Sequence, residues 1–180
     1  GGLSLSLAYH PSVSSTSSQA GGVSGAGETS SNVNYAITYV PSMIEGLTLA
    51  YGASKTEVMS AATANDDEEM TMAVNYVNGS LSVGYQISEV QSGAAGANGN
   101  NVEEFGIAFA VNENLSVSYN QADNEDDAPS GTNRTEDSTG ISAAYTMGSA
   151  SIRLAMNEAD NVNGDTATDE NLELSVKLSF

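Results

Sequence analysis

The sequence predicts an all-β fold, an antiparallel transmembrane β-barrel of which ten strands are visible. Three observations lead to this prediction. Apolar and polar residues alternate in ten segments, short and long connections alternate between those segments, and one strand motif recurs along the chain. Successive side chains of a strand point to opposite faces, so each segment has one face suited to an apolar environment and one suited to water.

The last segment shows this alternation most clearly. From Asn171 to Phe180 every second residue is apolar, and Glu173, Ser175, Lys177 and Ser179 lie between the apolar positions. In a soluble sandwich the apolar face would cover a second sheet, whereas in a membrane barrel it would face lipid. The other segments and their connections favour the barrel.

All ten segments repeat the pattern in chain order. Their apolar positions run over Leu3–Tyr9, Val33–Tyr39, Leu47–Tyr51, Met70–Tyr76, Leu81–Ile87, Phe105–Val111, Leu115–Tyr119, Ile141–Met147, Ile152–Met156 and Leu172–Phe180. The intervening positions are mostly Ser, Thr, Ala, Gly and Asn. Side chains this small could not plug a narrow lumen, so they predict a wide, water-filled barrel.

The connections between the segments alternate in length. Four are short turns, at Pro41–Gly46, Asn78-Gly79, Asn112–Asn114 and Gly148-Ser149. Five are long and polar, at His10–Ser31, Thr56–Asp67, Val90–Asn101, Asp123–Glu136 and Ala159–Asp169. Outer-membrane barrels have short periplasmic turns and longer external loops, which predicts that the long connections lie outside.

A repeated motif supports a succession of hairpins. Leu47–Tyr51, Leu81–Tyr85 and Leu115–Tyr119 recur with a spacing of 34 residues. Helical repeats of similar length exist, but this motif has a period of two residues and is separated by turns such as Asn78-Gly79.

Composition excludes several other classes of protein. The chain has 23 acidic and 4 basic residues, a net charge of −19, which argues against nucleic-acid binding. It has no Cys, which excludes disulfides and thiolate metal sites. No apolar run approaches the roughly 20 residues that a transmembrane helix needs.

The chain resembles a known family through its short strands, its acidic loops rich in Gly, Ser, Asn and Asp, and its ending "LELSVKLSF". It is similar to the C-terminal part of a general porin of the alphaproteobacterial type. That resemblance implies a barrel of 16 strands, so we expect residues 1–180 to form one barrel domain that lacks six N-terminal strands and the constriction loop.

The resemblance also implies a function and partners. General porins are trimeric, water-filled channels of the Gram-negative outer membrane, through which small hydrophilic solutes diffuse passively. We therefore expect the partners to be the lipid bilayer, lipopolysaccharide, two further copies in a homotrimer and the solutes themselves. No cofactor is expected.

Four charged residues are candidates for the pore wall, because their strand parity places them on the polar face. They are Arg153, Lys177, Glu173 and Glu104. Arg153 and Lys177 lie at similar distances from the short-turn edge on neighbouring strands, so we expect one basic patch. These residues would set a transverse field on passing solutes. The alternative is that they are ordinary polar lumen residues.

Acidic residues concentrate in the long connections, where we expect them to give the external mouth a negative charge. The candidates are Asp66, Asp67, Glu68, Asp123, Glu125, Asp126, Asp127, Asp160 and Asp165. Loosely bound Ca²⁺ or Mg²⁺ is one expectation, and solvated surface charge is the alternative. In both cases the loops would attract cations and repel anions, which predicts a cation-preferring channel.

The sequence predicts no enzyme. His10 is the single histidine, next to Pro11, and no Gly-x-Ser-x-Gly element, phosphate loop or set of histidine ligands accompanies it. Two other functions stay open beside the porin: an outer-membrane structural or adhesive barrel, and a secreted soluble β-protein with acidic ion-binding loops.

Overall fold

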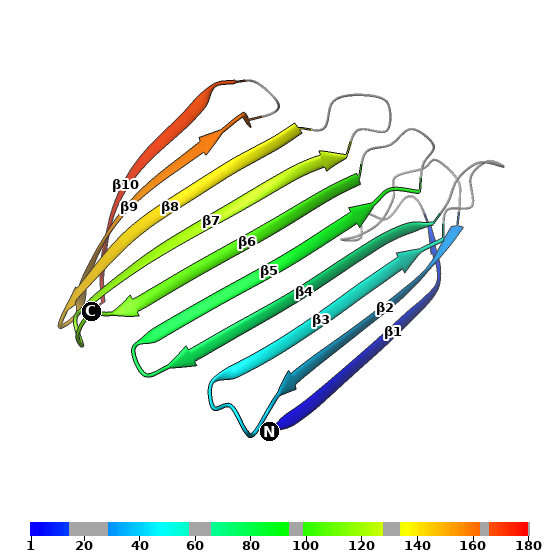
Figure 1. Cartoon of the computed structure of the whole chain (residues 1–180), viewed down its shortest axis with the longest axis horizontal. Helices are drawn as coiled ribbons and strands as arrows, with labels where there is room; N and C mark the ends of the chain where they lie inside the picture. Colours follow the sequence, from blue (N-terminus) through cyan, green and yellow to red (C-terminus); the bar gives the residue numbers. More distant parts are fainter. Residues whose placement is uncertain (15–28, 58–65, 94–98, 128–133, 163–165, 180) are drawn as a thin grey trace.

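In the computed structural model, which describes residues 1–14, 29–57, 66–93, 99–127, 134–162 and 166–179, ten strands form one antiparallel sheet (Figure 1). The spatial order is the chain order, β1 to β10. The strands are β1 (Gly2–Ser14), β2 (Thr29–Val40), β3 (Leu47–Thr56), β4 (Asp67–Asn78), β5 (Leu81–Gln91), β6 (Gly99–Ala110), β7 (Leu115–Asp127), β8 (Arg134–Met147), β9 (Ala150–Asp160) and β10 (Thr168–Leu178). The predicted all-β fold is confirmed.

The sheet is not closed. Strands β1 and β10 each have one hydrogen-bonded neighbour among the described residues, so each presents a free edge. Phe180 lies outside the described residues. Among those described, no helix has the length and hydropathy needed to cross a bilayer.

The strand ends that the short connections join all lie at one edge of the sheet, and the strand ends that lead into the long connections lie at the other (Figure 1). Gly79 and Gly148 hold the tightest turns with φ of +57° and +59°, a conformation that L-residues with a side chain adopt at a cost. In the turn before β7, the side-chain Oδ1 of Asn112 accepts hydrogen bonds from the backbone N–H groups of Asn114 (2.9 Å) and Leu115 (3.0 Å). The four predicted short turns are confirmed in place, except that the turn predicted at Asn78-Gly79 is formed by Gly79 and Ser80, because Asn78 is still paired with Leu81.

The long connections are shorter than predicted, because the strands continue into acidic segments. Strand β7 extends to Asp127 and β8 begins at Arg134, whereas we expected a loop over Asp123–Glu136. Strand β9 likewise ends at Asp160. Hydrogen bonds between the backbones of neighbouring strands do not need apolar side chains. The strands therefore stay paired toward the long connections, beyond the last residues at which apolar and polar side chains alternate.

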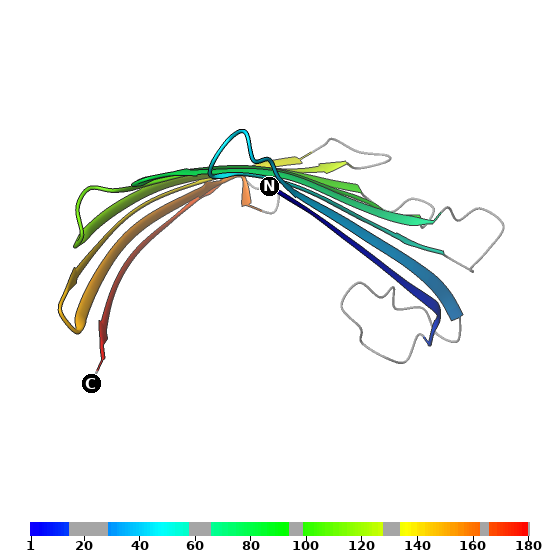
Figure 2. The ribbon, with the colours of Figure 1, turned by 90° about the horizontal axis from the view of Figure 1, so that it is seen from below.

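The sheet has no hydrophobic core of its own. Figure 2 shows it bent into an arc, with blue β1 and red β10 at opposite ends. Ala155, 2% exposed, is the one buried hydrophobic residue that the described part contains. Large apolar side chains stay exposed on one face, among them Ile141 at 61% and Leu174 at 67%. An apolar surface of this extent needs a covering other than water.

Candidate functional site

The register gives every strand residue one of two faces, and the polar face carries small side chains. Ser82 pairs with Ala108, Ala108 with Ser118, and Ser118 with Ser142. The Oγ atoms of Ser118 and Ser142 are 2.8 Å apart and hydrogen-bonded. Side chains converge on the inner side of a curved sheet, so small residues fit there, and we call this the concave face. The other is the convex face.

The convex face carries an apolar band that is continuous across strands. One row of directly paired residues is apolar from β4 to β10: Tyr76, Val83, Ile107, Tyr119, Ile141, Met156 and Leu172. The next row toward the long connections is apolar only to β6: Val74, Tyr85, Phe105, Gln121, Thr139, Glu158 and Glu170. The third is apolar only to β5: Met72, Ile87, Glu103, Asp123, Asp137, Asp160 and Thr168. The band therefore has a stepped upper limit, and polar residues, most of them acidic, lie directly above it.

This arrangement fits a wall between lipid and water. The convex face can contact hydrocarbon over the apolar band, and the acidic rows above it suit the polar headgroup region. The concave face offers hydroxyl and amide groups to water. From β2 to β9 each strand is hydrogen-bonded on both sides, as a lipid environment requires, and the free edges of β1 and β10 need a further partner to meet the same requirement.

Three of the four predicted wall residues come together near the edge of the sheet. Arg153 on β9 pairs with Ser175 on β10, and Lys177 and Glu173 lie two residues to either side of Ser175. Both are therefore diagonal neighbours of Arg153 on the concave face, a relation that brings side chains to roughly 7–8 Å in an antiparallel sheet. Arg153 thus has a basic and an acidic neighbour, an arrangement that the prediction of a purely basic patch did not contain.

The fourth, Glu104, lies apart from this group. It is on β6, paired with Gln86 on β5 and Ala122 on β7, and its row reaches β10 at Asp169. Glu104 therefore lies on the concave face but nearer the long connections than Arg153 does.

The predicted mouth acids lie at the edge with the long connections, but mostly on strands. Asp66 precedes β4, Asp67 and Glu68 begin it, and Asp160 ends β9. Strand β7 carries Asp123, Glu125, Asp126 and Asp127. The prediction that these acids occupy loops was wrong for Asp67, Glu68, Asp123, Glu125, Asp126, Asp127 and Asp160, because the strands are longer. Asp165 lies outside the described residues.

Their faces differ, which the sequence reading did not separate. Asp67 is opposite Thr56 and Asp126 opposite Arg134, both in concave rows. Glu68, Asp123 and Asp160 belong to convex rows. Acids of the convex rows therefore face outward at the edge of the wall, and only the concave ones face the interior.

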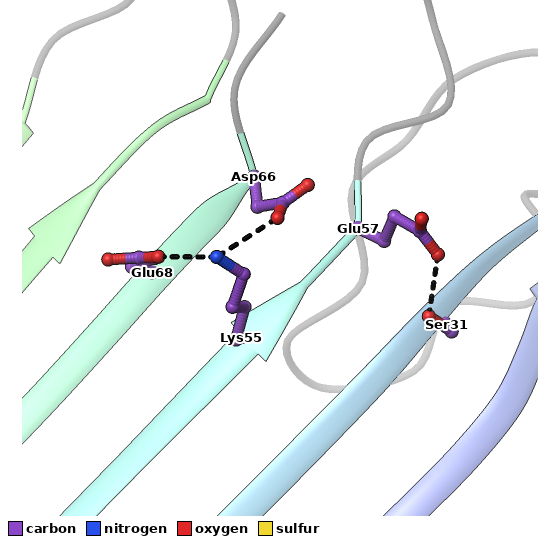
Figure 3. A network of polar contacts seen from close by, with 5 residues as sticks. All are labelled: Ser31, Lys55, Glu57, Asp66 and Glu68. Carbon is purple, nitrogen blue, oxygen red and sulfur yellow. Dashed lines mark hydrogen bonds and ion pairs between the residues drawn. The ribbon is translucent and has the colours of Figure 1, made fainter.

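An ion-pair network on the convex face was missed at the sequence level. Lys55 Nζ lies 3.0 Å from an Asp66 carboxylate oxygen and 2.7 Å from one of Glu68 (Figure 3). Beside it, the Ser31 hydroxyl donates to a Glu57 carboxylate oxygen at 2.8 Å, and the backbone N–H of Glu57 donates to the Ser31 carbonyl at 2.9 Å. These contacts join the upper ends of β2, β3 and β4. They depend on register, which the sequence does not give directly.

Carboxylates do not gather into a cation cage in the part of the chain that the structure describes. No group of three or more His, Cys, Asp or Glu residues there could hold a metal ion. The acids are instead spread in rows across several strands.

Comparisons with known proteins identify a family. Residues 1–178 match the model of the family described as Gram-negative porin. A search of the curated proteins found no match.

Proposed function

This chain belongs to the Gram-negative porin family, and from that premise we propose that it forms the wall of a water-filled outer-membrane channel through which small hydrophilic solutes diffuse passively, with a preference for cations. The observation that carries the proposal is the coreless, two-faced sheet. Its convex side exposes large apolar residues, and its concave side carries small polar ones. Such a sheet separates lipid from water, with no catalytic arrangement required.

Charge supports the preference for cations. The chain carries 23 acidic and 4 basic residues, and acids crowd the edge that faces outward in barrels of this kind. A negative entrance raises the local concentration of cations and lowers that of anions.

Further expectations about partners belong to this proposal. We place the convex apolar band against the bilayer or against neighbouring subunits of a homotrimer, and the acidic rows above it at the level of lipopolysaccharide. Divalent cations such as Ca²⁺ or Mg²⁺ would act there as loosely held counterions between carboxylates and lipid phosphates.

Single-channel recording on the full chain reconstituted in a planar bilayer tests the proposal. We expect stepwise, long-lived conductance and, in a salt gradient, a reversal potential of the sign for cation preference. A heat-modifiable, membrane-inserted barrel that conducts no ions would contradict the channel and favour the structural or adhesive alternative. Conductance with anion preference would contradict the selectivity alone.

A further inference from the structure

The concave face has a hollow in the middle of the described sheet, over β4 to β7. Its volume is about 600 Å³, within the roughly 300–1,000 Å³ of small-molecule sites. The floor is glycine backbone: Gly84 on β5 is paired directly with Gly106 on β6. Side-chain amides and a carboxylate stand around that floor, from Asn75, Gln86, Asn120 and Glu104.

Gly84 and Gly106 each leave room for a methyl group. A Cβ added at Gly84 would have its nearest neighbour at 3.9 Å, and one added at Gly106 at 4.0 Å. Both distances are ordinary van der Waals contact, so alanine would fit without moving the backbone. Gly84 and Gly106 therefore deepen the floor of the hollow, and the fold does not require the absence of the two methyl groups.

The rim groups are free to bind. In the described part of the chain, neither Asn75, Asn120 nor Glu104 makes a side-chain hydrogen bond, and Gln86 uses only its Nε2, donating to the Ser88 hydroxyl at 3.2 Å. The backbone of the floor is hydrogen-bonded within the sheet. The hydrogen-bond donors and acceptors that a ligand can use are therefore the side chains of the rim.

The row that contains Gly84, Gly106 and Asn120 continues beyond the hollow, where a further glycine has amide side chains on both sides. Asn120 pairs with Gly140, and Gly140 with Asn157. A Cβ at Gly140 would lie 2.6 Å from Asn120 Oδ1 and 2.8 Å from Asn157 Oδ1. The absence of that Cβ lets the Asn120 amide lie over Gly140, toward β8, so Asn120 borders the hollow on the side of β8.

The rim chemistry favours hydroxyl groups as ligands. Each amide presents both N–H donors and a carbonyl acceptor, and a hydroxyl likewise donates and accepts. An ammonium group would donate only and leave the amide N–H groups without partners. One carboxylate, Glu104, accepts a further hydroxyl hydrogen bond. No aromatic ring lies on the concave rows of the hollow to stack against a ligand, which favours weak, short-lived binding.

We propose that this hollow is a transient binding subsite for neutral polyhydroxylated solutes, of the size of a single sugar, on their way through the channel. The inference rests on the proposed function, since it assigns a solute class to the same water-filled interior. A solute bound there keeps most of its rotational and conformational freedom and dissociates quickly, as transport requires.

Current block by glucose tests the inference on the full chain in planar bilayers. We expect glucose to reduce the ion current in a saturable way, and a methyl-capped oligo(ethylene glycol) of equal size, which has no hydrogen-bond donors, to show no saturation. Asn120→Ala should raise the half-blocking glucose concentration about three- to tenfold, the value of a hydrogen bond or two. The double change Gly84→Ala with Gly106→Ala, which fills part of the floor with two methyl groups, should also raise it.

Two matched changes serve as controls. Gly52→Ala adds a methyl group on β3 with the same clearance, 3.9 Å, outside the hollow. Asn171→Ala removes an amide from β10, also outside the hollow. Neither should alter the block.

The outcomes separate the subsite from the channel. A conducting protein whose glucose block is the same in the hollow variants, or is matched by the methyl-capped glycol, overturns the subsite and leaves the channel intact. If the protein conducts no ions, the proposed function fails, and NMR of the micellar protein decides the subsite independently. A glucose-dependent shift of the Asn120 side-chain amide supports it, and the absence of that shift overturns it.

Discussion

At the scale of single residues, the face of the sheet on which a residue lies decides which substitutions the protein tolerates there. Val83 and Val117 belong to convex rows, whereas Ser82 and Ser116 belong to concave rows. The paired neighbours of Val83 are Tyr76 and Ile107, both apolar. A charge at Val83 would therefore meet hydrocarbon, and one at Ser82 would meet water.

We predict that Val83→Arg and Val117→Arg each lower the free energy of unfolding by roughly 2–4 kcal/mol, the cost of Arg near mid-membrane on a barrel's lipid face. Reversible urea titration in lipid vesicles measures it. Ser116→Arg is the matched change on the opposite face and should cost much less. Similar losses on both faces would indicate a soluble sandwich in place of a membrane wall.

A second prediction at this scale concerns the turn at Gly79. Its φ of +57° is unfavourable for a residue with a Cβ, although no atom lies within 4 Å of the site. Gly79→Ala should therefore destabilise the protein by about 1–2 kcal/mol through backbone strain alone. Gly52→Ala, in a strand, should not destabilise it, because a strand glycine already carries an entropic cost. Equal effects in the same titration would refute the strain argument.

Side-chain neighbours across strands were the part of the site that sequence alone did not reveal. Lys55 is opposite Glu68 because β3 and β4 pair in one particular register. Parity placed Arg153 and Glu173 on one face, but only the pairing of Arg153 with Ser175 makes Glu173 its diagonal neighbour. Register across the long connections follows from the assembled sheet and is not written locally in the chain.

At the scale of strands and connections, the meander gives the molecule two unlike edges. Ser149 lies in the turn between β8 and β9, and Ala167 lies just before β10 at the opposite edge. The chain contains no Cys, so single cysteines introduced at these exposed positions would be the only reactive thiols.

We predict that Ala167→Cys reacts with a bulky polyethylene glycol maleimide in intact cells, whereas Ser149→Cys reacts only after the outer membrane is permeabilised. The reason is that long connections lie outside and short turns in the periplasm. A gel shift on labelling measures it. Labelling of Ser149→Cys, but not of Ala167→Cys, in intact cells would reverse the proposed orientation.

Strands were predictable in number and order, but not in length. A period of two residues identifies a strand wherever one face is apolar, which holds for all ten. Toward the long connections that contrast disappears, because both faces become polar. Strand β7 illustrates this, since Gln121 to Asp126 pair with β8 although no apolar side chain except Ala122 marks the segment.

At the scale of the whole molecule, charge is distributed very unevenly. Of the 4 basic residues, Arg153 and Lys177 lie together on the concave face of β9 and β10, and Lys55 is held by two carboxylates on the convex face. In the channel proposed above, the basic charges of Arg153 and Lys177 would oppose the negative entrance.

We predict that replacing both Arg153 and Lys177 with Gln strengthens the cation preference, since Glu173 then loses its basic neighbours. The preference of both proteins should weaken with salt, because the Debye length falls from about 30 Å at 0.01 M to about 3 Å at 1 M. Reversal potentials in KCl gradients measure both effects. Ser151→Gln, on the same face of β9, is the neutral control. An unchanged preference in the double variant would mean that the charges act elsewhere.

The stepped upper limit of the apolar band has a geometric consequence. On β4 the apolar positions reach up to Met70, whereas on β10 they reach only Leu172, which shares the row of Tyr76. The limit descends from the row of Met70 to the row of Tyr76 between β4 and β7 and stays in that row to β10, so over the six spacings from β4 to β10 it descends on average by one residue per spacing. Six residues span about 20 Å along a strand, and six spacings span about 29 Å across the sheet.

A membrane surface is flat, so this slope must vanish when the sheet is in place, and the strands must lean by about 35° from the membrane normal. That lean falls in the range of roughly 35–45° found for outer-membrane barrels. The positions at which acidic residues follow apolar ones thus indicate both the tilt of the strands and the depth at which they lie in the membrane. Each strand crosses the hydrocarbon layer obliquely and needs about a fifth more residues than an upright strand would.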